Sequence, residues 1–399
     1  MTPFWHDSSS ASEVRSAQIQ NALEQIGHVA TLVLDDADDV PCNATSVASE
    51  LKNVPRLRVR SQPPHNVRAK LNWIFNSRSQ WPHGVAAERG ALDRLLEMQK
   101  AFDLIWFFKF RSANFFPRWN WPSSVVDIDD VPSTFEKSVL RTTRSVSKRV
   151  STSVRVWSWR RREKLIGERF SVITVCSEED KQYLRNLGVD APIHVVANGF
   201  NQPNVPPTRT PSNPPRIGFI GVFDHGPNLE GIRWFVKECW PRIKTQVPDA
   251  RLRLVGRFSD GPLKPEGIDI DALGWMADPT SEIGTWSSMI VPVHLGAGTR
   301  GKIAHAFSLK CPVVSTPLGA HGYDAHDGVE MFLADSGDAF AEACVRTVRQ
   351  PVLAAAVAER AWQRFLERWT WDAIRPHVWA AVDQCLRMKT SDRYAATVR

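Results

Sequence analysis

The residues best suited to binding an anion lie in a glycine-rich segment of the second half of the chain. Residues 296–302 read Gly-Ala-Gly-Thr-Arg-Gly-Lys and separate an apolar strand pattern from a helical pattern. Glycine lets the backbone approach an anion closely, and a helix start offers free N–H groups and the positive end of the dipole. Because Arg300 and Lys302 add positive charge, the segment predicts a phosphate-binding turn; a simple tight turn is the alternative. It matches neither the Walker motif nor the NAD fingerprint.

Three aspartates end a strand pattern in the first half of the chain. Asp127, Asp129 and Asp130 lie at the end of the apolar run Ser124–Ile128. Ligands of open α/β sheets bind at strand ends, and a carboxylate there can accept the proton of a hydroxyl group. We therefore predict these aspartates as catalytic candidates. Helix capping and solvated charge are the alternative interpretation.

A strongly basic segment spans residues 141–162. It holds eight Lys and Arg residues and no acidic residue, with Val and Trp residues between them. A basic amphipathic helix of this kind can lie on an anionic membrane surface. Nucleic-acid binding would need a similar segment, but no nucleic-acid motif accompanies it, and a solvated helix face is the alternative. The residues predicted to contact the anionic surface are Trp157, Trp159, Arg160, Arg161 and Arg162.

The composition indicates a folded, multidomain protein with an anionic partner. The 399 residues are 43% hydrophobic and 23% charged, which predicts two or three domains rather than disorder. No apolar run is long enough to span a membrane, and no signal-peptide pattern begins the chain. Six cysteines without a C-x-x-C pair argue against a disulfide framework or a zinc site and favour a reducing, cytoplasmic compartment. The net charge of +7 favours an anionic partner.

The chain divides at a proline-rich segment, residues 201–215, which we predict to be an extended hinge. After it, short apolar runs alternate with helical patterns, which predicts parallel strands with right-handed crossovers and hence a Rossmann-like domain. The expected strands are 216–220, 251–255, 289–293, 312–315 and 331–333, and the expected helices are 228–246, 300–310, 338–349 and a region from 352 onward.

The first half follows the same alternation less regularly, which predicts a second Rossmann-like domain. The first strand is short, since only Met1–Trp5 is available for it. The other expected strands are 29–34, 104–108, 124–128, 172–175 and 193–196, and the expected helices are 11–25, 88–102 and 178–187.

The sequence resembles the GT-B fold glycosyltransferases of the retaining GT4 family, also called glycosyl transferases group 1. In the second half the resemblance lies in residues 217–228 (IGFIGVFDHGPN), 248–257 (PDARLRLVGR), 296–315 and 318–322 (LGAHG). In the first half it lies in residues 125–130 (VVDIDD), 173–180 (ITVCSEED) and 194–199 (HVVANG). The Trp371-Asp372 pair that begins the last helix is also similar to the family.

The resemblance implies an α/β protein of GT-B fold, with two Rossmann-like domains facing across a central cleft. The acceptor-side domain would be 1–200, the hinge 201–215, the donor domain 216–370, and the helix 371–399 would cross back to the first domain. Acceptor-side residues would be His6, Ser8, Ser9 and Lys109. Donor-binding residues would be Gly221, Val222, Asn228, Gly256, Arg257, Gly296, Ala297, Gly298, Thr299, Arg300, Lys302 and His305.

The sequence departs from the family at two sites. The family usually carries two glutamates eight positions apart, where this chain has Ala297 and His305, and a serine-rich stretch replaces its first glycine-rich loop. His305 would hydrogen-bond ribose hydroxyls; a surface histidine without a ligand is the alternative.

The resemblance implies a metal-independent transferase that takes a UDP- or GDP-sugar as donor and a saccharide or lipid-linked acceptor. A silent nucleotide- or glycan-binding protein and a nucleotide-sugar epimerase are the alternative functions. The protein would be cytoplasmic, with contact to the inner face of the cell membrane.

Overall fold

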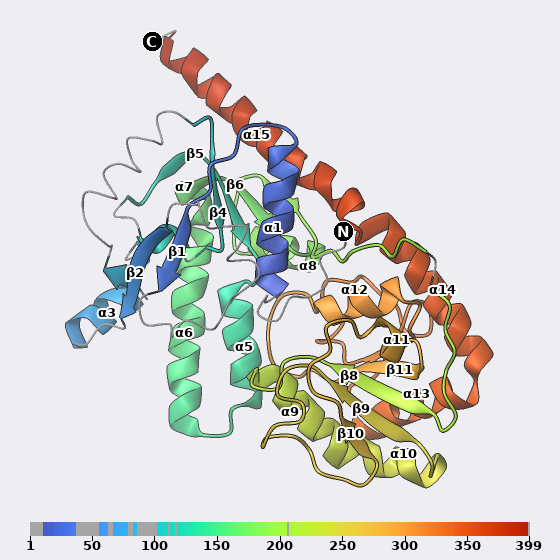
Figure 1. The fold of residues 1–399 in the computed structure, drawn as a ribbon. Coiled ribbons are helices and arrows are strands. Elements are labelled where there is room, and N and C mark those ends of the chain that lie inside the picture. Colours follow the sequence, from blue (N-terminus) through green and yellow to red (C-terminus); the bar gives the residue numbers. More distant parts are fainter. Residues whose placement is uncertain are drawn as a thin grey trace. The chain divides into compact units, whose positions relative to one another are not determined.

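The computed structural model describes residues 11–36, 56–62, 67–78, 83–85, 102–110, 112–115, 118–205 and 207–397. They form two compact units. The N-terminal unit extends to Val196 and takes up the chain again from Arg375, and the C-terminal unit is Ala197–Ile374. Each unit is an α/β domain built on a parallel sheet (Figure 1).

The C-terminal unit is built on six parallel strands in the order β10-β9-β8-β11-β12-β13. Counted along the chain, this is the order 3-2-1-4-5-6 of the Rossmann fold, so the predicted fold class is confirmed. The strand order reverses between β8 and β11. The strands are β8 (Arg216–Ile220), β9 (Arg251–Val255), β10 (Ile270–Ala272), β11 (Trp286–Val291), β12 (Val313–Ser315) and β13 (Phe332–Leu333).

Helices cover both faces of this sheet. Residues of α9, α10 and α13 form one apolar core with β8, β9 and β12. Residues of α12 and α14 form a second core with β11 and β12. The helices are α9 (Gly226–Trp234), α10 (Trp240–Gln246), α11 (Thr280–Ile283), α12 (Gly301–Ser308), α13 (Gly337–Arg349) and α14 (Pro351–Arg368).

A π-helical turn, Phe235–Cys239, joins α9 to α10. Pro241 follows it at the start of α10 and has no N–H to donate to the preceding turn, and its ring would clash with a regular α-helical carbonyl. The wider turn keeps the predicted helix 228–246 continuous while it accommodates this proline.

The segment predicted as a hinge packs along the C-terminal unit. The N–H groups of Thr210 and Ser212 donate to the carbonyl oxygens of Gly284 (3.1 Å) and Thr285 (2.9 Å). The division between the units falls earlier, between Val196 and Ala197. Backbone hydrogen bonds therefore attach part of this proline-rich segment to the C-terminal unit, and its role as a hinge stays a prediction.

The N-terminal unit is built on a four-stranded parallel sheet and a separate three-stranded sheet. The first has the order β4 (Ile105–Phe108), β5 (Trp121–Ile128), β6 (Phe170–Val175) and β7 (Ile193–Val195). The second pairs β1 (Val33–Asp36) with β2 (Arg56–Gln62) in parallel and β2 with β3 (His83–Val85) in antiparallel orientation. The helices are α1 (Ala11–Glu24), α3 (Val67–Phe75), η2 (Ser112–Phe115), α5 (Pro132–Thr142), α6 (Val146–Lys164), α7 (Ile166–Arg169) and α8 (Glu178–Asn186).

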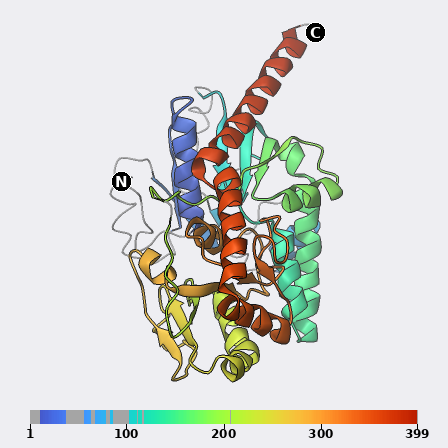
Figure 2. The ribbon, with the colours of Figure 1, turned by 90° about the vertical axis from the view of Figure 1, so that its right-hand side faces the viewer.

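The last helix, α15 (Trp371–Thr397), begins in the C-terminal unit and joins the N-terminal unit at Arg375. Its Ala381 and Cys385 are buried against β5 and β6. The Trp379 indole N–H donates to the Ala22 carbonyl of α1 (2.7 Å), and Figure 2 shows α1 and α15 side by side. No helix in the described ranges is long and apolar enough to cross a bilayer.

The expected strands and helices agree with the structure except in a few places. Helices α3, α5, α7 and α11, the short helix η2 and strands β2, β3 and β10 were not predicted. The basic segment 141–162 is not one helix, because the chain breaks at residues 143–145 between α5 and α6. The strand expected at 1–5 and residues 88–101 of the helix expected at 88–102 lie outside the described residues.

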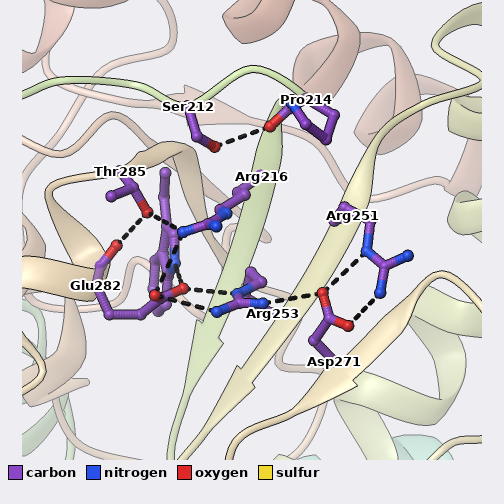
Figure 3. A network of polar contacts seen from close by, with 9 residues as sticks. Ser212, Pro214, Arg216, Arg251, Arg253, Asp271, Glu282 and Thr285 are labelled. Carbon is purple, nitrogen blue, oxygen red and sulfur yellow. Dashed lines mark hydrogen bonds and ion pairs between the residues drawn. The ribbon is translucent and has the colours of Figure 1, made fainter.

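Charged side chains form a ladder on one part of the C-terminal sheet (Figure 3). Arg253 of β9 donates to Glu282 of α11 (2.7 Å) and to Asp271 of β10 (3.0 Å), and Arg251 also donates to Asp271 (3.0 Å). The hydrogen bond from Arg251 lowers the pKa of Asp271 below its usual value of 3.8. Burial works to raise the pKa of Glu282, but hydrogen bonds from Arg253 and Trp286 outweigh it and lower this pKa below 4.5.

We expect this ladder to make the protein sensitive to acid. Both carboxyl groups have a lower pKa in the folded than in the unfolded chain, so their stabilisation is complete above pH 4.5 and is lost as the pH falls through the folded values. Urea unfolding between pH 3 and pH 7 measures this. The double variant Asp271→Asn, Glu282→Gln should show a shallower fall in unfolding free energy; an unchanged slope would contradict the assignment.

Candidate functional site

The predicted phosphate-binding turn lies where the strand order of the C-terminal unit reverses. Gly221 follows β8, Gly256 follows β9, and the turn at 296–298 lies between β11 and α12. In open α/β sheets, ligands bind at the carboxyl ends of the strands at such a reversal. The structure therefore brings most of the predicted donor-binding residues to one edge of one sheet.

Close contact between two backbones shapes this edge. Gly256 has a φ of +125°, and a Cβ atom on it would lie 2.1 Å from the carbonyl oxygen of Gly221. Only glycine fits both the conformation and the space. The turn after β9 therefore packs directly on the turn after β8, and the backbone N–H of Gly221 donates to Val255 (3.0 Å).

Helix α12 begins behind a glycine turn, and its N-cap side chain makes no capping hydrogen bond. Gly296 and Gly298 have φ angles of +130° and +69°, which residues with a side chain rarely adopt. Arg300 is the N-cap residue. Its guanidinium donates instead to the carbonyl oxygens of Ala297 and Gly298 (2.9 Å to Gly298). Arg300 therefore holds the turn while it places positive charge at the helix start.

Two polar side chains from elsewhere in the unit secure the same turn. The Tyr323 hydroxyl, buried at 1% exposure, donates to the Arg300 carbonyl (2.9 Å) and accepts the Ala304 N–H (3.2 Å). The Asn198 side-chain amide donates to the Thr299 hydroxyl (2.8 Å). Sequence reasoning did not name Tyr323 or Asn198 as site residues, although Asn198 lies within the segment 194–199 and Tyr323 directly follows the segment 318–322, because their contacts with the turn join residues far apart in the chain.

Lys302 is the most perturbed cation of the site. Its Nζ atom donates to Asn228 Oδ1 (2.9 Å) and lies 3.9 Å from the centre of the Phe219 ring. Burial, and then repulsion by Arg300, lowers the pKa of Lys302 to about 7. Burial and the same two cations also lower the pKa of His225, the N-cap residue of α9. The edge of the sheet therefore has an electropositive field suited to an anion.

Two further predicted donor-binding residues, Val222 and Arg257, lie in the turns after β8 and β9. The Val222 carbonyl accepts a hydrogen bond from the Asn228 amide (2.9 Å), so this residue fixes Asn228 through its backbone. The Arg257 guanidinium lies 5.2 Å from the centre of the exposed Phe258 ring.

His305 is buried, in contrast to the surface position considered in the sequence analysis. Its side chain is 4% exposed and stacks on Phe200 with ring centres 4.3 Å apart and planes at 19°. Burial lowers the pKa of His305 to about 4, so the ring is neutral at pH 7. In this position it packs inside the unit, and a contact with ribose stays a prediction.

Asp127 has a structural position in the N-terminal unit. It is fully buried, its two carboxylate oxygens accept hydrogen bonds from Arg15 (2.7 and 2.9 Å), and Thr174 also donates to it (2.6 Å). Burial works to lower the pKa of Arg15, but attraction to Asp127 outweighs this and raises it. This corrects the prediction that Asp127 meets a substrate.

Asp129 and Asp130 lie beyond the strand end and keep their candidate role. Asp129 is half-buried and accepts a weak hydrogen bond from the Cys176 thiol (3.4 Å), and Asp130 is exposed. Lys109 is exposed, with a φ of +68°. His6, Ser8 and Ser9 lie outside the described residues.

Two of the five residues predicted to meet an anionic surface are inside the N-terminal unit. Trp159 is 3% exposed and packs edge-on against Trp73 of α3, and Arg162 is 4% exposed. The Arg162 guanidinium donates to the carbonyl oxygens of Trp73 and Asn76. The prediction was wrong for these two residues because α3 covers them; Trp157, Arg160 and Arg161 remain at the surface.

The fold and this site define a GT-B type protein, and comparison with solved structures agrees. Sucrose-phosphate synthase from Thermosynechococcus elongatus is 16% identical, with a TM-score of 0.59 over 98% of this chain and 95% of that one. Anabaena Alr3699/HepE in complex with UDP-glucose is 16% identical, with a TM-score of 0.61 over 95% and 97%. A glycosyltransferase from Rickettsia africae ESF-5 is 15% identical, with a TM-score of 0.60 over 95% and 96%.

Residues 214–350, which lie within the C-terminal unit, match the family described as Glycosyl transferases group 1. The match includes the turn at 296–302, Lys302 and Tyr323. No curated protein matches the chain. Among the described residues, no group of three His, Cys, Asp or Glu side chains is placed to hold a metal ion.

We expect Asp127→Ala to destabilise the N-terminal unit. It would leave the Arg15 charge buried without its partner, a change that typically costs about 3–5 kcal/mol. Thermal unfolding measures the loss, and the double variant Arg15→Met, Asp127→Leu should recover most of the stability because it removes both charges. A fully stable Asp127→Ala protein that loses catalytic activity would instead restore the catalytic interpretation.

Proposed function

We propose that the protein transfers a glycosyl group from a nucleotide-sugar to a hydroxyl acceptor, with the donor diphosphate on the start of α12. The observation that carries this proposal is the desolvated Lys302 ammonium beside Arg300 and an uncapped helix N-terminus. A diphosphate would relieve the repulsion between the two cations and accept hydrogen bonds from the first backbone N–H groups of α12, those of Gly301 and Lys302. The group 1 domain and the UDP-glucose complex of HepE support this proposal.

In this mechanism the C-terminal unit assists departure of the nucleoside diphosphate. Negative charge grows on the leaving phosphate as the sugar–oxygen bond breaks, and preorganised cations and N–H groups stabilise that charge most in the transition state. Lys302 and Arg300 supply the cations, and Tyr323 holds the helix start through hydrogen bonds to Arg300 and Ala304. The acceptor hydroxyl loses its proton to the leaving phosphate or to a carboxylate such as Asp129 or Asp130.

Several finer features form part of the same proposal. We propose a GT4-like, retaining hexosyltransferase that takes a UDP- or GDP-sugar without a metal ion. Its acceptor would be a saccharide or a lipid-linked saccharide in polysaccharide or glycoconjugate assembly. We place the protein in the cytoplasm, at the inner face of the cell membrane. Among the described residues, Cys239, Cys311, Cys344 and Cys385 carry free, buried thiols, which supports a reducing compartment.

Buried His305 favours a second candidate function, a silent GT-B protein that binds a nucleotide or glycan without transferring a sugar. The family usually has a glutamate at this position, whereas His305 stacks on Phe200. Such a protein would keep the diphosphate site and lack turnover.

A donor panel separates the two functions. Thermal shift with UDP-, GDP-, dTDP- and ADP-sugars identifies the donor, since a ligand that binds the folded state raises its unfolding midpoint. We then expect nucleoside diphosphate to be released from that donor only when a saccharide acceptor is present. Binding without acceptor-dependent release over a broad acceptor set would favour the silent protein, and no shift with any donor would overturn both functions.

We also expect donor binding to weaken as the pH rises above 7. Lys302 binds the diphosphate as a cation, and its pKa of about 7 in the free protein means that binding must take up a proton at higher pH. The Kd for UDP-glucose, whose diphosphate keeps its charge in this range, should rise by up to about tenfold from pH 7 to pH 8.

Calorimetry of the parent and two variants measures this effect. Lys302→Met should weaken binding at pH 7 by about 1–3 kcal/mol, the size of a lost charge-assisted hydrogen bond, and should remove the pH dependence. Lys264→Met, which removes an exposed lysine of the same unit, serves as the control. If Lys302→Met keeps the parent's pH dependence, the diphosphate binds elsewhere.

A further inference from the structure

Helix α6 exposes an apolar stripe to solvent. Val146, Val150 and Trp157 are 76%, 61% and 44% exposed. Spacings of four and seven residues return to the same side of a helix, so these three side chains form one line. Arg161 continues the line one turn further, with its guanidinium 4.5 Å from the centre of the Trp157 ring. The stripe is therefore apolar along most of its length and basic at one end.

Helix α3 adds a second exposed apolar line beside the first. Val67, Leu71 and Phe75, spaced four residues apart, are 71%, 48% and 64% exposed. The Phe75 ring meets the Trp157 ring edge-on, with centres 6.1 Å apart, and Arg161 donates to the Phe75 carbonyl (3.2 Å). The two lines therefore join at Phe75 and Trp157. We call these six apolar residues the α3–α6 face.

Buried contacts hold this face in place. On its inner side α3 inserts Trp73 against Trp159, and the Arg162 guanidinium lies 4.5 Å from the Trp73 ring centre. Trp159 belongs in turn to the apolar core that includes β5 and β6. The exposed apolar residues therefore sit on anchored helices rather than on loops.

The surroundings of the face are strongly basic. Among the described residues of α3 and α6 the exposed charges are positive, and the acidic side chain of α6, Glu163, is fully buried. Glu136 of the neighbouring α5 pairs with Arg155, and Glu168 of α7 pairs with Arg78. The basic residues that are exposed on α3 and α6 are Arg68, Lys70, Lys148, Arg149, Arg160 and Lys164.

We propose that the α3–α6 face docks on the surface of an anionic lipid bilayer. An exposed apolar patch of this extent marks an interaction site, and a basic rim complements anionic headgroups while the apolar residues enter the interface between headgroups and chains. A single-stranded nucleic acid is less suited, because it stacks on aromatic platforms and four of the six residues are aliphatic. This surface differs from the one predicted from the sequence, since it includes α3 and excludes Trp159 and Arg162.

Vesicle flotation tests the proposal. Vesicles of phosphatidylcholine alone are compared with vesicles that contain 30% phosphatidylglycerol, a composition chosen to give about one anionic lipid in three, at low and high salt. We expect the parent protein to bind the anionic vesicles at low salt, to dissociate from them at high salt, and not to bind the neutral vesicles. Leu71→Ser, Phe75→Ser should lower the partition coefficient at least tenfold. Each basic residue near an anionic surface contributes roughly a factor of five, so Lys148→Ser, Arg160→Ser should lower it by about 25-fold.

Matched controls separate docking from loss of folding or of general charge. Ile268→Ser, Val352→Ser removes two apolar residues of the other unit that are 90% and 84% exposed, and Lys237→Ser, Lys264→Ser removes two of its exposed lysines. All variants should keep the parent's thermal midpoint, and both controls should bind vesicles as the parent does. The proposal is overturned if the parent does not bind anionic vesicles, if it binds neutral vesicles equally, or if the controls lose as much binding as the α3–α6 variants. Binding to RNA in place of vesicles would also overturn it.

Discussion

The C-terminal unit holds two half-buried cations, Arg300 and Lys302, at the start of α12. The Lys302 ammonium donates to the side-chain amide oxygen of Asn228 and lies over the face of the Phe219 ring. Burial lowers the pKa of Lys302, and repulsion by Arg300 lowers it further. A desolvated like-charge pair is costly unless an anion joins it. The glycine turn, whose Gly298 carbonyl accepts from Arg300, and the buried Tyr323 hydroxyl, which bonds the Arg300 carbonyl and the Ala304 N–H, hold the start of α12 in place. The structure is therefore most complementary to an anion.

Local signals explain why much of this unit could be predicted from sequence. The strand–helix alternation after residue 215 predicts parallel strands, and the glycine-rich segment predicts the turn before α12. Both depend on residues close together in the chain. The strand β10 was missed because its three residues, Ile270–Ala272, include Asp271, whose role becomes visible only when Arg251 and Arg253 are placed beside it.

Contacts between distant segments explain what the sequence could not predict. Asp127 has the same sequence context as a strand-end ligand, but Arg15, 112 residues earlier, binds both its carboxylate oxygens. His305 occupies a ligand position of the helix, but Phe200 stacks on it from the segment before β8. In both cases a side chain from a distant segment contacts the atoms that a substrate would otherwise contact. The type and spacing of the residues around Asp127 and His305 do not indicate that this distant side chain is there.

The basic helix α6 shows how one residue step separates two roles. Successive residues of a helix point about 100° apart, so Arg161 and Arg162 face different surroundings although their sequence context is nearly identical. Arg162 points inward, where it donates to the Trp73 and Asn76 carbonyls, and burial lowers its pKa to about 10. Arg161 points outward to Trp157. The position of α3 decides which side is inward, and the same packing that buries Trp159 leaves Trp157 and Phe75 in contact with solvent. The hydrophobic effect makes exposure of these apolar side chains to water unfavourable. A second surface that covers the α3–α6 face would remove this free-energy cost.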